Sequence, residues 1–352
     1  MTSVDRAKDP PERCGILRLV RAVVCHQPGA IEHLRIEEVP DPSPGPDEVE
    51  VEVEFAGLSY LDVLIVGGTY QLQFKTPFIP GGEFAGRVVR VGRAVEQYRV
   101  GDLVVGETVI GALADRVVAH PNQLVPLPRD MNRALAATVL QSYTTALYAL
   151  THRISLQSGD TVLVLGAGGG VGSACVDVAR SLGASVVAVA SSAAKRAAAL
   201  SLGALAAIDP EREDLKLRAR QLSAPRLDVV VDPVGGALAE PALRALGYGG
   251  RYLVVGFASG SIPSFPLNLV LLNNRQVVGV ELGAETKNNP GLARDLAYEV
   301  IAGVIEGRFR PLEPRVENFE RALEALQTIR DRDVIGKVAL DLRRFPGQER
   351  LI

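Results

Sequence analysis

Hydrophobic and polar positions alternate along the first third of the chain. From Val49 to Phe55, valines alternate with glutamates, which predicts a strand with one buried face and one face in water. Similar short apolar runs occur at 88–92 and 100–108, between turns rich in glycine and proline. The first ~125 residues are therefore predicted to form a compact, mostly antiparallel β domain.

A different pattern begins at about residue 130. Residues 131–153 carry an alanine-rich helical pattern, after which short apolar strands alternate with helical segments. This alternation predicts an α/β fold: a Rossmann-type doubly wound parallel sheet whose ligand lies at the carboxyl ends of the strands. The tail from Asn289 predicts longer helices and a last strand that packs back onto the N-terminal domain. The six strands predicted for the parallel sheet are 161–166, 185–190, 206–209, 227–232, 251–256 and 276–280.

These patterns divide the chain into three parts. Residues 1–20 mix charges, prolines and a few apolar residues, and are predicted to be a disordered extension. Residues 21–129 and 282–352 are predicted to form the catalytic domain. Residues 130–281 are predicted to form the nucleotide-binding domain.

A cluster of glycines between the first strand of the parallel sheet and the next helix predicts the nucleotide site. Five glycines lie within 166–172. They let the backbone approach a pyrophosphate closely, and the amide groups at the start of the helix point at the anion. The spacing fits A-x-G-x-x-G rather than the strict G-x-G-x-x-G pattern. The predicted pyrophosphate-binding residues are Gly168, Gly169, Gly170, Val171 and Gly172.

The end of the second strand of this sheet predicts which dinucleotide binds. NAD sites usually place Asp or Glu about 20 residues beyond the glycines, to hold the ribose 2′-hydroxyl. Here the chain has no acid, and instead has Ser191, Ser192, Lys195 and Arg196. Hydroxyl donors and positive charge suit a 2′-phosphate, so NADPH is favoured over NADH. The alternative is that a serine caps the helix and both cations are solvated, and the two interpretations are compatible.

Composition narrows the classes of partner. The 352 residues carry a net charge of −3, which gives no indication of a nucleic-acid surface. No apolar stretch reaches the roughly 18 residues of a membrane span, and residues 1–20 lack the long apolar core of a secretory signal. The three cysteines are far apart without C-x-x-C spacing, so neither a disulfide framework nor a cysteine-rich zinc site is expected. These features predict a cytoplasmic protein with no nucleic-acid or membrane partner.

The order of a β domain, an inserted Rossmann-type domain and a returning tail resembles the medium-chain dehydrogenase/reductase superfamily. The stretches LVLGAGGGVG (163–172), VGFASG (255–260) and GKVAL (336–340) together resemble its zinc-independent quinone oxidoreductase (zeta-crystallin-like) branch. This resemblance implies a GroES-like catalytic domain and hydride transfer from NADPH. Two departures from the alcohol dehydrogenases imply that no metal is bound. Ser59 stands where the C-x-x-D stretch has a cysteine ligand, and Gly82 stands where G-H-E has histidine.

The resemblance also implies which residues act in catalysis. Ser59, Tyr70 and Tyr143 are the candidate hydrogen-bond donors to substrate. Tyr70 could instead be a half-buried aromatic on a turn, and Tyr143 could be part of a helix core. Loops after two strands of the parallel sheet are expected to line the cofactor crevice. The further cofactor-binding candidates are Thr145, Val234, Phe257, Ser259 and Lys337.

The function predicted from these features is an NADPH-dependent quinone oxidoreductase, which transfers hydride to a quinone or an enone without zinc. An enoyl- or acryloyl-thioester reductase is an alternative, although only Lys75 near Tyr70 would suit a coenzyme A tail. An alternative of another class is a non-catalytic NADPH-binding protein of the crystallin type. The resemblance implies a homodimer, and the apolar segment 262–280 is the expected contact.

Overall fold

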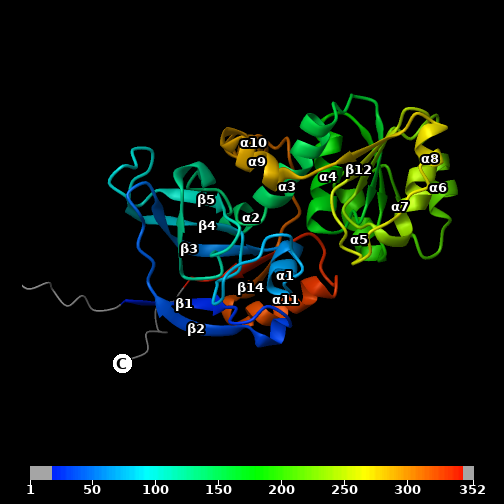
Figure 1. The fold of residues 1–352 in the computed structure, drawn as a ribbon. Coiled ribbons are helices and arrows are strands. Elements are labelled where there is room, and N and C mark those ends of the chain that lie inside the picture. Colours follow the sequence, from blue (N-terminus) through cyan, green and yellow to red (C-terminus); the bar gives the residue numbers. More distant parts are fainter. Residues whose placement is uncertain (1–17, 344–352) are drawn as a thin grey trace, which may run out of the picture.

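The computed structural model describes residues 18–343, which form two main sheets with helices packed against them (Figure 1). One sheet contains β8 (Thr161–Leu165), β9 (Ser185–Val189), β10 (Ala206–Ile208), β11 (Val229–Asp232), β12 (Arg251–Val254) and β13 (Gln276–Gly279). Its strands are all parallel and lie in the order β10-β9-β8-β11-β12-β13. The order reverses between β8 and β11, as in doubly wound nucleotide-binding sheets, so the predicted Rossmann-type fold is confirmed.

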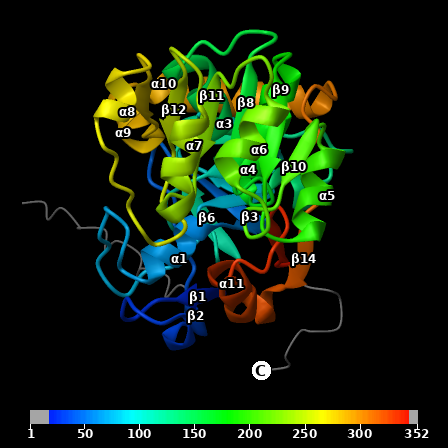
Figure 2. The same ribbon diagram turned by 90° about the vertical axis from the view of Figure 1, so that its right-hand side faces the viewer.

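Alternate residues of β8 face two different cores. Val162 and Val164 pack in one core with α3 (Leu140–Leu147) and α4 (Gly170–Ser181). Leu163 and Leu165 pack in another core with α6 (Leu215–Leu222) and α7 (Ala239–Ala245). The sheet is therefore buried on both faces, which explains the unbroken apolar run of the strand. Figure 2 shows its strands side by side, with α5 (Ala193–Ser201) and α8 (Asn268–Leu271) toward opposite edges.

The second sheet is mostly antiparallel and confirms the predicted GroES-like architecture. Its order is β14-β15-β3-β4-β5-β7, and β6 pairs with β3. Only β14 and β15 are parallel among its pairs in residues 18–343. The strands are β3 (Val49–Leu58), β4 (Glu83–Val91), β5 (Leu103–Glu107), β6 (Arg116–Ala119), β7 (Leu124–Pro126), β14 (Arg315–Asn318) and β15 (Val338–Asp341). Because β15 lies beside β3, the tail packs against the N-terminal part of the chain, as predicted.

A two-stranded sheet lies at the start of this domain. It pairs β1 (Leu19–Val24) with β2 (Arg35–Pro40) in antiparallel fashion. Leu19 and Val20 were assigned to the predicted disordered extension, but they are the first residues of β1. Their pairing with Pro40 and Val39 satisfies the backbone there. The rest of that predicted extension, 1–17, lies outside the described residues.

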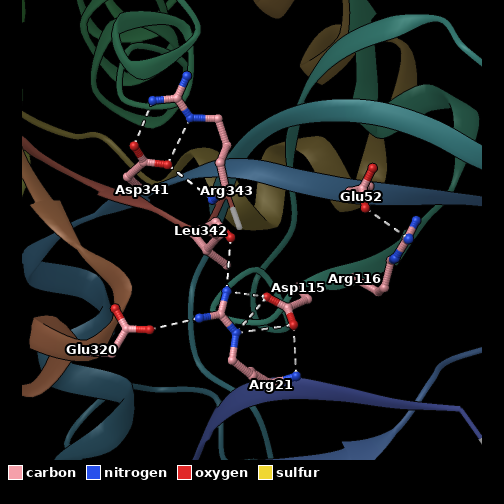
Figure 3. A network of polar contacts seen from close by, with 8 residues as sticks. All are labelled: Arg21, Glu52, Asp115, Arg116, Glu320, Asp341, Leu342 and Arg343. Carbon is pink, nitrogen blue, oxygen red and sulfur yellow. Dashed lines mark hydrogen bonds and ion pairs between the residues drawn. The ribbon is translucent and has the colours of Figure 1, made fainter. Parts of the chain in front are cut away.

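Arg21 of β1 joins distant segments of the catalytic domain (Figure 3). Its guanidinium lies 2.9 Å from Asp115 Oδ1 and 2.8 Å from Glu320 Oε1. It also donates a hydrogen bond of 2.9 Å to the carbonyl oxygen of Leu342. Asp115 precedes β6 and Leu342 follows β15, so this side chain connects the beginning of the described chain to its end.

Most of the remaining helices connect the two sheets or cover the catalytic domain, and the 3-10 turn Gly236–Leu238 leads from β11 into α7. The chain crosses between the sheets through α2, α3 and a π-helix, and returns through α9 and α10. Within residues 18–343, no helix has both the length and the apolar character needed to cross a membrane. These remaining elements are α1 (Tyr60–Val66), α2 (Arg133–Ala136), the π-helix (Tyr148–Arg153), α9 (Leu282–Asn288), α10 (Pro290–Ile305), α11 (Ala322–Arg330) and four 3-10 turns (Ile31–His33, Pro121–Gln123, Gly236–Leu238 and Phe319–Arg321).

Candidate functional site

The glycine turn between β8 and α4 has the close backbone packing that a pyrophosphate cradle requires. Gly166 has a φ of +61°, and its carbonyl oxygen accepts a hydrogen bond of 3.0 Å from Gly169 N. A Cβ at Gly172 would lie 2.1 Å from the Gly166 oxygen, so no larger residue fits there. Helix α4 begins at Gly170, and the first amide groups of a helix have no partner within it. The turn therefore fits a dinucleotide phosphate, as its glycine spacing predicts.

The returning tail closes over this turn. Gly336 N donates to Gly168 O at 2.9 Å, and Gly336 forms a parallel bridge with Gly169. The next residue, Lys337, lies over the start of α4, because a Cβ at Gly170 would lie 2.8 Å from Lys337 Cδ. The structure thus brings the predicted cofactor residue Lys337 to the glycine turn, although 165 or more residues separate them in sequence.

The two predicted crevice loops follow neighbouring strands and are hydrogen-bonded to each other. Ser259 N donates to Val234 O at 2.8 Å, which joins the loop after β12 to the loop after β11. Val234 also reaches the glycine turn, since a Cβ at Gly166 would lie 2.7 Å from Val234 Cγ2. Phe257 is exposed on the same loop as Ser259. Val234, Phe257 and Ser259 are therefore brought together at the carboxyl ends of the strands.

At the end of β9, the two serines and two cations have different roles. Ser192 caps α5, because its Oγ accepts a hydrogen bond of 3.2 Å from Lys195 N. The Arg196 guanidinium lies 3.0 Å from Asp209 and donates to the carbonyl oxygens of Ala190 and Ser191 at 2.9 Å each. Arg196 thus holds the carboxyl end of β9 in place and has its charge paired. The capping interpretation holds for Ser192, whereas the solvated interpretation fails for Arg196.

A cation from the other end of the chain lies beside Lys195. The Lys195 ammonium donates a hydrogen bond of 2.5 Å to the carbonyl oxygen of Arg332. Burial and the nearby Arg332 charge lower the pKa of Lys195, and Asp333 opposes this shift. Lys195 also packs directly on the glycine turn, because a Cβ at Gly168 would lie 2.5 Å from Lys195 Cβ. Lys195 therefore lies on the turn, with the charges of Arg332 and Asp333 both near enough to affect it. Sequence reasoning missed Arg332, since no spacing relates it to Lys195.

A buried group of charges lies at the end of the catalytic sheet. The Lys337 ammonium lies 2.5 Å from Glu83 Oε1, and both side chains are at least nine-tenths buried. Glu107 is the residue directly opposite Glu83 in the pairing of β4 with β5. Burial and the negative charge of Glu83 raise the pKa of Glu107 to about 8, while Lys337 acts in the opposite direction. Sequence reasoning missed Glu107, because its position depends on the strand register.

Ser59 is the N-cap residue directly before α1 and is hydrogen-bonded to Asp62. Its amide nitrogen and its hydroxyl donate to Asp62 Oδ2 at 2.7 and 3.1 Å. Burial raises the pKa of Asp62 to about 6, although these hydrogen bonds and the Lys337 charge lower it. The hydroxyl proton of Ser59 is directed at Asp62, so the serine presents its oxygen lone pairs, rather than its proton, to other groups.

Tyr70 and Tyr143 lie in different surroundings. Tyr70 lies on the loop after α1, where it is partly buried, and burial raises the pKa of its hydroxyl. Tyr143 is 4% exposed, and its hydroxyl donates to Asp177 Oδ2 at 2.9 Å within the core between α3 and α4. This geometry fits the helix-core alternative for Tyr143 rather than the donor role. Thr145, one turn of α3 away from Gln141, donates to Gln141 O at 2.7 Å.

Two family models match most of the two domains. The alcohol dehydrogenase GroES-like domain matches residues 45–129, and the zinc-binding dehydrogenase model matches residues 170–297. Together with the two sheets, these matches define the class: the chain belongs to the medium-chain dehydrogenase/reductase superfamily of oxidoreductases. Quinone oxidoreductase-like protein 2 of Bos taurus is 37% identical over 333 residues, which are 94% of this chain and 94% of that protein. Within the superfamily, the chain belongs to the quinone oxidoreductase branch.

Solved structures agree with this assignment. The quinone oxidoreductase of Pseudomonas syringae pv. Tomato DC3000 superposes with a TM-score of 0.85 at 28% identity, over 92% of this chain and 99% of that one. A mycobacterial protein in complex with NADPH has a TM-score of 0.85 at 27% identity, over 91% of this chain and 99% of that one. The chain is thus similar over nearly its whole described length to proteins of this branch.

Proposed function

We propose that the protein is an NADPH-dependent reductase that transfers hydride to a quinone or an enone without a catalytic zinc ion. This proposal rests on the residues that occupy the two positions where zinc-dependent relatives have metal ligands. Ser59 is hydrogen-bonded to Asp62, and Gly82 has no side chain. A hydroxyl and a glycine are poor substitutes for thiolate and imidazole. Quinones and enones suit such a site, because they accept hydride without a Lewis acid.

The preference for NADPH is proposed from the charges beside the glycine turn. When bound, NADPH supplies the hydride. The amide groups at the start of α4 would hold its pyrophosphate. Lys195 and Arg332 are the cations that would bind a 2′-phosphate, although Asp333 already offsets part of the positive charge at Lys195. Arg196 would act indirectly, by fixing the strand end that carries Ser191.

The chain's own residues would bind and orient the acceptor. Tyr70 keeps its hydroxyl proton at neutral pH, because the pKa of a tyrosine is about 10 and burial raises it further, and Tyr70 is the proposed donor to the substrate oxygen. Thr145 and Val234 would flank the cofactor from α3 and from the loop after β11. Val234 contacts the glycine turn, and α3, which carries Thr145, packs against α4. Hydride transfer needs such fixed positions, because binding in the reactive geometry supplies much of the rate.

A cofactor titration followed by a turnover screen tests the proposal. Binding of NADPH and of NADH is compared by fluorescence, and oxidation of each is then followed with 1,4-benzoquinone, a naphthoquinone, a simple enone and crotonyl-coenzyme A. Tighter NADPH binding with quinone or enone turnover is expected. Turnover of the thioester alone would make the protein a thioester reductase. Tight NADPH binding without turnover on any acceptor would favour the non-catalytic alternative, and equal binding of NADH would overturn the phosphate argument.

A homodimer through the open edge of the parallel sheet is also proposed. Strand β13 is the last strand in the sheet order, so one side of its backbone is unpaired within residues 18–343. Beside it, Ile262, Leu267, Leu271 and Leu272 are between 71% and 79% exposed. Light scattering during gel filtration should give twice the chain mass. Leu271→Glu should reduce that mass to one chain, whereas Leu205→Glu at the opposite edge should not. The predicted cytoplasmic location stays a prediction.

A further inference from the structure

Asp232 is a buried carboxylate at the carboxyl end of β11, and three uncharged donors bind it. The side chain is 2% exposed. Its Oδ1 accepts hydrogen bonds of 2.8 and 2.7 Å from the backbone nitrogens of Val234 and Gly235. Its Oδ2 accepts a hydrogen bond from the hydroxyl of Tyr252. Burial of a polar group is costly unless it is hydrogen-bonded, so the burial of Asp232 favours a loop that keeps both amides on the carboxylate.

Asp232 lies at the edge of the parallel sheet where folds of this type bind ligands. Strand β11 lies beside β8, at the point where the strand order reverses (Figure 2). Asp232 is the last residue of β11, and the glycine turn follows β8. Both therefore lie at the carboxyl ends of adjacent parallel strands. Tyr252 of β12 pairs with Val230, and Asp232 lies two residues further along the same face of β11.

The two amides that Asp232 holds belong to residues that contact the predicted cofactor-binding segments. Val234 contacts the glycine turn, because a Cβ at Gly166 would lie 2.7 Å from Val234 Cγ2. Gly235 has a φ of +67° and contacts the loop after β12, because a Cβ there would lie 3.0 Å from Phe257 Cδ1. Any shift of the loop after β11 would therefore disturb both contacts.

We propose that Asp232 is a positioning residue for the dinucleotide: it holds Val234 and Gly235 so that the glycine turn and the loop after β12 are correctly spaced around the cofactor. This inference rests on the proposed function, which assigns that crevice to NADPH. Asp232 acts through the loop and does not itself bind the cofactor. Loss of its side chain would leave two amides and a hydroxyl without their acceptor, and the loop would shift. A misplacement of about 1 Å can slow a reaction by roughly 10².

Asp232→Ala and its matched control, Asp228→Ala, test this role. Asp228 directly precedes β11, is 8% exposed and accepts a hydrogen bond of 2.9 Å from Thr161 N, at the end of the strand away from the crevice. Both variants should lower the urea midpoint of unfolding. Only Asp232→Ala should weaken NADPH binding by roughly tenfold and slow hydride transfer to 1,4-benzoquinone in a single turnover by roughly 10².

NADH provides a further readout that separates Asp232 from the proposed 2′-phosphate site. That site lies beside α5, which follows β9, and β9 and β11 lie on opposite sides of β8. Asp232→Ala should therefore weaken NADH binding by the same factor as NADPH binding. Fluorescence titration with both dinucleotides measures the two factors. A loss confined to NADPH would show that Asp232 acts through the 2′-phosphate and would overturn the inference.

Two milder variants keep the inference testable even if Asp232→Ala does not fold. Asp232→Asn retains an oxygen acceptor for the two amides, so NADPH affinity should stay within about threefold of wild type. Tyr252→Phe removes only the hydroxyl donor, and it should slow hydride transfer by about threefold to tenfold.

Failure of this inference and failure of the proposed function give different results. Hydride transfer at the wild-type rate in Tyr252→Phe, or equal NADPH affinities of Asp232→Ala and Asp228→Ala, would overturn the inference and leave the proposed function intact. If the wild-type protein binds NADPH but reduces no acceptor, the proposed function fails, while the affinity comparison still decides the inference. A wild-type protein that binds no NADPH would overturn both.

Discussion

The hydroxyl of Tyr143 on α3 lies 2.9 Å from Asp177 Oδ2 on α4, in a part of the core where both side chains are buried. The same carboxylate accepts from the backbone of Arg310 at 2.5 Å, and its other oxygen lies 2.6 Å from the Arg180 guanidinium. Burial and the Asp177 charge raise the pKa of Tyr143 far above its ordinary value. Tyr143 is buried and hydrogen-bonded to Asp177, so its role is to link α3 to α4. Through Asp177, helix α4 is hydrogen-bonded to Tyr143 of α3 and to Arg310 of the tail.

Tyr143→Phe is therefore expected to change stability rather than catalysis. It removes one hydrogen bond to a charged, buried group, which should lower the free energy of unfolding by about 1–3 kcal/mol. Urea unfolding measures that loss, and steady-state kcat with a quinone should stay within about threefold of wild type. Tyr248→Phe, at an exposed tyrosine whose hydroxyl accepts a hydrogen bond from Asn274, is the control and should change the free energy of unfolding by no more than about 0.5 kcal/mol and leave kcat unchanged. A fall of kcat by about 10² or more with unchanged stability would restore Tyr143 as a donor.

Gly172→Ala tests the glycine turn directly. A methyl group there would overlap the Gly166 carbonyl oxygen, so the turn must open and move the amide groups at the start of α4. We expect NADPH affinity to fall about tenfold or more, which corresponds to at least about 1.4 kcal/mol. Isothermal titration measures the affinity. Gly279→Ala is the matched control, because nothing lies within 4 Å of its added Cβ. Equal affinities of the two variants would contradict the proposed phosphate position.

The parallel sheet and the glycine turn could be predicted because their signals are local. The apolar run of β8 shows burial on both faces, since Val162 and Leu163 face different cores. Five glycines directly after that run indicate a backbone that must approach something closely. The alternation of valine and glutamate in β3 indicated the antiparallel domain in the same way, through the two-residue period of a strand.

Much of the candidate site could not be predicted, because it depends on pairings between distant segments. Lys195 and Arg332 are 137 residues apart, and they meet only because the tail packs on the glycine turn. Glu107 faces Glu83 only in one register of β4 with β5, and a shift of one residue would turn it to the opposite face. Arg196 was expected to bind phosphate because its charge was visible in the sequence, whereas its partner Asp209 was not.

Arg332→Asn is expected to change the cofactor preference. Arg332 has a φ of +60°, and asparagine tolerates this left-handed conformation better than most residues, so the backbone should be retained. Loss of one phosphate-binding cation should weaken NADPH binding by roughly 10- to 100-fold and leave NADH binding nearly unchanged. Fluorescence titration with both cofactors measures the ratio. Arg330→Asn, which removes a cation paired with Glu32 and Asp331, is the control. Equal weakening of NADPH and NADH would show that Arg332 acts only through the fold.

Glu107 also makes stability depend on pH, in a direction that its environment determines. Its pKa is about 8 in the folded protein because of burial and Glu83, and about 4.3 in an unfolded chain. Between these values the folded protein binds a proton that the unfolded chain has released. Stability contributed by this group is therefore full below about pH 4 and is lost progressively as the pH rises to about 8.

Glu107→Gln removes this dependence and should make the protein more stable than wild type at alkaline pH. At about pH 9 we expect its free energy of unfolding to exceed that of wild type by about 1–3 kcal/mol, and the gain should shrink at about pH 5. Urea unfolding at the two pH values measures the difference, with Glu96→Gln as the surface control. A gain of equal size at both pH values would mean that the glutamine improves packing, and no gain at pH 9 would mean that the Glu107 carboxylate is well paired with Lys337 in the folded protein.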